Sequence, residues 1–121
     1  MSYDIRLKDK NTNETLLADF EPVRGGTYAI GYFNARPCTL NVTYNYRQHF
    51  VKAFGSEEGV RSIYGMSAKD SIPVLESAMG KLGNDVDDDY WKPTEGNARQ
   101  AIAGLLAIAK ASDPDGVWGG D

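Results

Sequence analysis

The stretch VRGGTYAIGYFNARPCTLNVTYNYRQHF, residues 23–50, contains the only Cys, the only His and four of the seven Tyr of this chain. Residues 27–33 and 38–44 are rich in the aromatic and β-branched side chains that favour strands, and residues 34–37 between them are typical of a turn. The stretch therefore predicts a β-hairpin. Its polar and aromatic side chains either line a binding site or form part of an ordinary tyrosine-rich core.

A second hairpin is predicted upstream. Apolar and charged residues alternate through residues 2–9, which is the pattern of a half-buried strand. Residues 10–14 are typical of a turn, and residues 15–20 return as a short second strand. The N-terminal part is therefore expected to supply about four strands, mostly antiparallel.

Downstream of the quoted stretch the apolar spacing becomes helical. Three helices are predicted, each behind a capping residue: from Asn45 to Gly55, from Ser71 to Gly83 and from Thr94 to about Ala111. Residues 100–109 carry no charge and are apolar nearly all round. Such a helix is either the centre of the fold or half of an interface between copies, so we expect a homo-oligomer, most simply a dimer.

These patterns predict an α+β fold, with a small, mostly antiparallel sheet packed against the helices. A chain of 121 residues is expected to form one domain. Within 1–121, residues 1–44 are expected to form β-hairpins, 45–112 helices, and 113–121 a C-terminal tail, a turn with an aromatic hook.

Composition excludes several classes of protein. The net charge of −4 has the wrong sign for broad nucleic-acid binding. The longest apolar run, residues 101–109, is far shorter than a membrane span, so no membrane association is expected. A single cysteine, Cys38, excludes an internal disulfide, and no signal-peptide pattern is present at residues 1–9, so a reducing cytoplasm is expected.

No catalytic or metal constellation is recognised, so we predict neither an enzyme nor a cofactor. Asp85, Asp87 and Asp89 have the first spacings of a calcium loop, but the Gly and the bidentate Glu that the loop needs are missing. Cys38 and His49 lack the signature of a thiol nucleophile and its base, and an isolated Cys is more typical of a core.

A ligand site is predicted within the quoted stretch. Backbone N–H groups of Gly25, Gly26 and Thr27, with the charge of Arg24, are suited to an anion, although the glycines equally suit a connection that needs dihedral freedom. Stacking surfaces and polar contacts would come from four further residues, Tyr28, Tyr46, Asn41 and Thr43.

Several segments resemble those of a widespread family of small proteins encoded by phages and prophages. They include RGGTYAIG, LNVTYNY, SIYGMSAKDSIPVLE, DDYW and DPDGVWGGD, and together with the others they cover nearly the whole chain. The resemblance implies a viral protein that acts in the cytoplasm of a host bacterium.

By analogy with small phage proteins, this origin predicts a non-enzymatic binding protein that counters host defence. The first expectation is a sponge that sequesters a small anionic nucleotide signal. The alternative is a protein that binds and inhibits a host defence nuclease, as an anti-CRISPR does, using the acidic linker and Trp91. A small virion or accessory protein is the third expectation.

Overall fold

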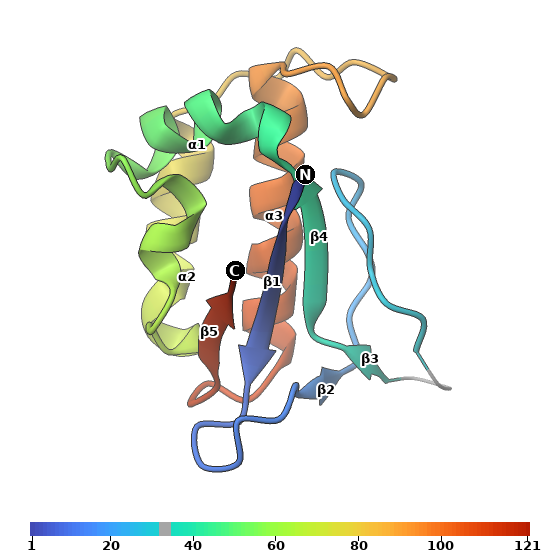
Figure 1. Cartoon of the computed structure of the whole chain (residues 1–121), viewed down its shortest axis with the longest axis vertical. Helices are drawn as coiled ribbons and strands as arrows, with labels where there is room; N and C mark the ends of the chain where they lie inside the picture. Colours follow the sequence, from blue (N-terminus) through green and yellow to red (C-terminus); the bar gives the residue numbers. More distant parts are fainter. Residues whose placement is uncertain (32–34) are drawn as a thin grey trace.

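The computed structural model describes residues 1–31 and 35–121, so residues 32–34 of the predicted hairpin lie outside the described part. The fold is α+β, as predicted, with three α-helices and a small antiparallel sheet (Figure 1). The elements, in chain order, are β1 (Ser2–Lys8), β2 (Leu17–Ala18), β3 (Arg36–Pro37), β4 (Thr39–Thr43), α1 (Arg47–Phe54), α2 (Ala68–Gly80), α3 (Glu95–Ala111) and β5 (Val117–Gly120), with short 3₁₀ helices at Tyr44–Tyr46 and Gly59–Ile63.

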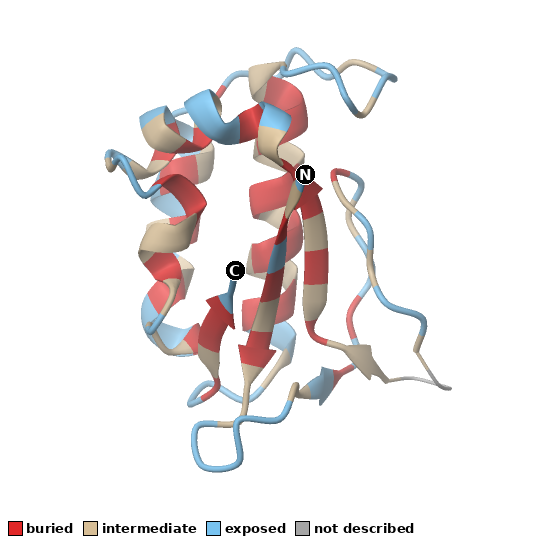
Figure 2. Cartoon of the chain, viewed as in Figure 1, coloured by how far each residue is buried: buried red, intermediate tan, exposed pale blue. Residues whose placement is uncertain are grey.

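The main sheet has the strand order β4-β1-β5, with antiparallel pairing on both sides of β1. Its side chains alternate as the sequence predicts: Tyr3, Ile5 and Leu7 are buried, whereas the charged residues between them reach the opposite face. This alternation produces the red bands along β1 and β4 in Figure 2. Helix α3 lies behind β1 and β4 (Figure 1), so the apolar side of the sheet packs on the helices and the polar side is left open.

Strand β5 corrects the prediction for the C-terminal tail. Residues 113–121 were expected to form a turn, but Val117–Gly120 pair with β1, and Trp118 stands opposite Leu7. Trp118 is 1% exposed, and its indole N–H donates to Ser71 Oγ at 2.8 Å. Two glycines give this segment a weak strand propensity, so pairing with a strand more than a hundred residues away decides its structure.

The two predicted hairpins form only in part, and in each the predicted pairing is reduced to a single bridge. Of residues 15–20, Thr15 bridges to Lys8 of β1 and the Leu16 N–H donates to the Leu7 carbonyl at 3.0 Å, as the first hairpin requires. Leu17–Ala18 then form β2, which pairs with β3 instead of β1. Of residues 27–31, only Thr27 pairs, through a single bridge to Asn41. The cause lies just before it: Gly25 has φ +129°, and a Cβ there would lie 2.6 Å from the backbone N of Ala101, so the chain packs against α3 instead of extending as a strand.

The predicted helices are present, with two caps reassigned. Gly55 ends α1 in the left-handed conformation, and Thr94 Oγ1 caps α3 by accepting from the Asn97 N–H, both as predicted. Ser67 caps α2, whereas Ser71 lies inside it, and the Asn45 N–H itself donates to the capping Thr43. Helix α3 is the central helix, with nine buried residues, and self-association of the chain stays a prediction.

Candidate binding site

A small cleft lies beside the end of β4, lined by residues of β4, of the N-terminus and of the loop between α2 and α3. In Figure 1 this loop is the orange trace above the N-terminal end of α3. Its volume is about 200 Å³, and Tyr90 and Trp91 of that loop form its aromatic wall. The polar side chains that line it are Ser2, Thr27, Asn41 and Thr43. Three of the eight residues predicted to bind a ligand therefore come together here: Thr27, Asn41 and Thr43.

Hydrogen bonds within the protein already occupy much of this polar lining. Asn41 Nδ2 donates to Ser2 Oγ at 2.9 Å, and the Thr43 N–H donates to the hydroxyl of Tyr90 at 2.7 Å. Thr27 and Asn41 exchange two backbone hydrogen bonds of 2.8 Å each. The polar groups of the cleft therefore connect the segments that line it.

Trp91 is the exposed part of this surface. Trp91 is 61% exposed. Its ring packs edge to face on the ring of Tyr90, with the ring centroids 4.9 Å apart. The backbone beneath the ring is fixed on both sides. The Trp91 carbonyl accepts from Asn45 Nδ2 at 2.8 Å, and the Trp91 N–H donates to Asp89 Oδ1 at 3.0 Å.

The loop that carries Trp91 is held by the buried side chain of Asn97. Its Oδ1 accepts from the Asp87 N–H at 3.0 Å, and its Nδ2 donates to the carbonyls of Asp89 and Lys92 at 3.1 and 3.0 Å. The Tyr46 hydroxyl adds a further bond to the Tyr90 carbonyl. The loop therefore has one defined shape, although its residues have no regular secondary structure.

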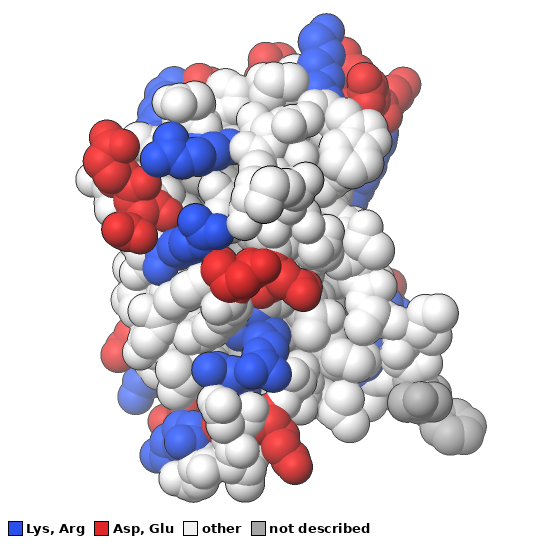
Figure 3. Space-filling model, viewed as in Figure 1, with Lys and Arg blue, Asp and Glu red and all other residues white. Residues whose placement is uncertain are grey.

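The loop is also acidic. Residues 84–92 contain four Asp and one Lys, a net charge of −3, and Figure 3 shows carboxylates gathered beside this end of the molecule. Asp88 is fully exposed and pairs with Arg24 at 3.4 Å, and Asp87 pairs with Lys92 at 3.3 Å. The hydrogen bond from the Asp89 N–H lowers the pKa of Asp87, and the nearby Lys92 lowers it further, so this carboxylate stays charged at neutral pH.

The structure places the other five predicted residues away from the cleft lining. Arg24 donates to the Asp88 carbonyl at 2.8 Å, Gly25 packs on α3, and a Cβ on Gly26 would clash with Leu40. Tyr46 is fully buried, and burial, ahead of the nearby Tyr90 and Asp89, raises its pKa to about 12. The remaining residue, Tyr28, faces α3.

Tyr28 has a structural role that can be tested. Its hydroxyl donates to the Val23 carbonyl at 2.7 Å, and a Cβ on Gly104 would clash with that hydroxyl. Gly104→Ala should therefore lower the free energy of unfolding by about 1–3 kcal/mol, although Ala favours a helix. In a Tyr28→Phe background the same change should cost at least about 1 kcal/mol less, as measured by urea denaturation. Equal costs in both backgrounds would contradict this contact.

Cys38 and His49 have separate partners. Cys38 is buried, its Sγ lies 3.6 Å from Ser112 Oγ, and burial raises the pKa of the thiol. His49 Nε2 lies 2.8 Å from the Pro93 carbonyl oxygen. The thiol is therefore held protonated in the core, and the imidazole is engaged with the loop.

No protein-family model matches this chain, and neither curated proteins nor solved structures give a match. Among the helices of residues 1–31 and 35–121, none is long and apolar enough to cross a membrane. Function must therefore be inferred from the geometry around Trp91. The sequence analysis did not assign Tyr90 or Asn97 to the site. The feature that could have indicated Tyr90 is the aromatic pair Tyr90-Trp91 inside an acidic linker.

Proposed function

We propose that the chain is a non-enzymatic, phage-encoded binding protein that inhibits a host defence protein by docking through the Trp91 surface, defined as Trp91, Tyr90 and the acidic loop 84–92. The observation that carries this proposal is a tryptophan 61% exposed on a backbone that Asn45, Asp89 and Asn97 fix in place. Exposed aromatic anchors on rigid supports are typical of binding hot spots, because little conformational freedom is lost on association.

The charge of this surface indicates the chemistry of the partner. With a net charge of −3 over residues 84–92, the loop complements a basic surface. Nucleases present such surfaces, because they bind the phosphate backbone of nucleic acids. A defence nuclease is therefore the partner class that we propose.

The same geometry gives less support to a nucleotide sponge. Among the described residues that line the cleft, none is Lys or Arg, and the one cation predicted for the site, Arg24, is engaged with Asp88. A volume of about 200 Å³ is also smaller than the usual pocket of about 300–1,000 Å³. An anionic nucleotide there would also lie against a loop whose net charge is −3.

Trp91→Ala tests the proposal in a bacterium whose nuclease defence blocks a sensitive phage. Expression of the wild-type chain should restore plaques, and Trp91→Ala should abolish the restoration, because truncation of a hot spot weakens binding by about 30-fold or more. Leu17→Ala is the matched control, because Leu17 is also 61% exposed but lies on β2.

Two outcomes would contradict the proposal. Trp91→Ala that still restores plaques fully would remove the Trp91 surface from the function. Micromolar binding of a cyclic or ADP-ribose-type nucleotide, measured by calorimetry and lost in Arg24→Ala, would favour the sponge instead.

A further inference from the structure

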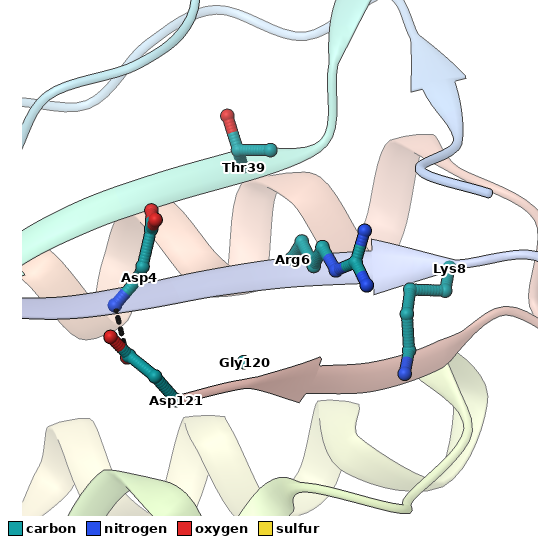
Figure 4. A pocket seen from close by; sticks show the side chains of 6 residues that line it. All are labelled: Asp4, Arg6, Lys8, Thr39, Gly120 and Asp121. Carbon is teal, nitrogen blue, oxygen red and sulfur yellow. Dashed lines mark hydrogen bonds between the residues drawn. The ribbon is translucent and has the colours of Figure 1, made fainter. Parts of the chain in front are cut away.

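A second hollow lies on the face of the sheet that the described helices leave open. It measures about 380 Å³ and is lined by Asp4, Arg6, Lys8, Thr39, Gly120 and Asp121. Figure 4 shows Arg6 and Lys8 at one end of it and Asp4 and Asp121 at the other, with Gly120 between them. The hollow therefore has a cationic end and an acidic end.

Two glycines of β5, Gly119 and Gly120, allow neighbouring groups to approach this strand closely. Gly119 stands opposite Arg6 in the register of β1 and β5, and a Cβ there would lie 2.8 Å from both Cε and Nζ of Lys8. Gly120 has φ +156°, and a Cβ there would clash with the Asp4 carbonyl. Gly119 therefore lets the Lys8 side chain lie along β5, and Gly120 lets β5 approach the backbone of β1 closely at the edge of the hollow.

The opposite charges do not neutralise one another. In the described part of the chain, neither Arg6 nor Lys8 forms an ion pair with a carboxylate. Arg6 Nη1 is directed to Thr15 Oγ1 at 3.4 Å, whereas Asp121 Oδ1 accepts from the Asp4 N–H at 2.8 Å. Because Arg61 Nε also donates to the Asp121 carbonyl at 2.7 Å, Asp121 is fixed in place at the acidic end.

We propose that this hollow binds a small linear ω-amino acid, a zwitterion with a carboxylate at one end and an ammonium group at the other. Its carboxylate lies between Arg6 and Lys8, which offer charged N–H donors, and its ammonium group lies against Asp4 and Asp121. Successive residues on one face of a strand are about 7 Å apart. A ligand with several carbons between its charges therefore spans the two ends better than an α-amino acid does.

Calorimetry and NMR titration with 4-aminobutyrate, 6-aminohexanoate and glycine test this proposal. The two longer zwitterions should bind at millimolar concentration, and glycine, butyrate and butylamine should each bind at least about tenfold more weakly, because each leaves one end of the hollow without its charge partner. Lys8→Met and Asp4→Asn should each weaken 4-aminobutyrate binding by about tenfold. Lys10→Met, at an exposed residue outside the hollow, is the matched control.

Trp91→Ala should leave this binding unchanged, which separates the hollow from the Trp91 surface. Backbone amide spectra of each variant confirm that the sheet is intact. If neither longer zwitterion binds, if butyrate binds as tightly as 4-aminobutyrate, or if folded Lys8→Met binds like the wild type, the proposal is wrong.

Discussion

Trp118→Ala is expected to lower the free energy of unfolding by about 3–5 kcal/mol, a large part of the stability of a domain this small. Trp118 is 1% exposed and packs on the helix side of the sheet opposite Leu7. Its truncation leaves a cavity and also removes the partner of Ser71 Oγ, which lies 2.8 Å from the indole nitrogen. The loss should be visible as a lower midpoint in urea denaturation.

Trp91→Ala is the matched control, because the chain has two Trp residues in opposite environments. Trp91 is 61% exposed, so its truncation should change the free energy of unfolding by no more than about 0.5 kcal/mol. If both variants are equally stable, Trp118 is not buried in the core as described, and the placement of β5 is wrong.

Local patterns in the sequence predicted the elements whose structure is decided locally. The alternation in β1 and the cap at Thr94 follow from residues a few positions apart, and both are confirmed. The fold class follows from these elements and from the order of strands and helices. Strand pairing was not predicted correctly. Strand β5 depends on contacts with β1, and the pair Gly119-Gly120 is more typical of a turn than of a strand.

The site was predictable only in part, for a related reason. Thr27, Asn41 and Thr43 line the cleft, and Asn41 and Thr43 share one face of β4 because side chains alternate along a strand. Gly25 and Tyr28 were assigned to a ligand, but they pack against α3, since glycines that allow close packing look the same in sequence as glycines that bind anions. The role of Asn97 was hidden because its side chain turns back from α3 to the preceding loop.

Asn97→Ala is expected to lower the free energy of unfolding by about 2–3 kcal/mol, because backbone groups that its amide now pairs lose their partner away from solvent. Asn97 is 2% exposed and bonds to Asp87, Asp89 and Lys92. Asn97→Asp keeps the size and the acceptor for the Asp87 N–H but loses the two donated bonds. It should therefore also destabilise the protein, and it places a further carboxylate beside an acidic loop.

The same variants test whether the loop positions Trp91. In protein labelled with 5-fluorotryptophan, the two Trp residues give two ¹⁹F resonances. Asn97→Ala should move the Trp91 resonance toward its value in the unfolded chain and leave that of Trp118 in place. Thr94→Ala is the control: it removes the N-cap of the same helix, at a cost of about 1 kcal/mol, but leaves the bonds from Asn97 to the loop.

If the proposed function is right and Trp91 is a preorganised anchor, Asn97→Ala should weaken inhibition of the proposed nuclease partner even though the Trp91 side chain is intact. The reason is that a mobile loop loses conformational freedom on binding, whereas the fixed loop does not. Plaque restoration should therefore fall in Asn97→Ala and persist in Thr94→Ala, at a temperature where both variants are folded. Full restoration by a folded Asn97→Ala, with the Trp91 resonance shifted, would show that exposure of the ring matters and its fixed position does not.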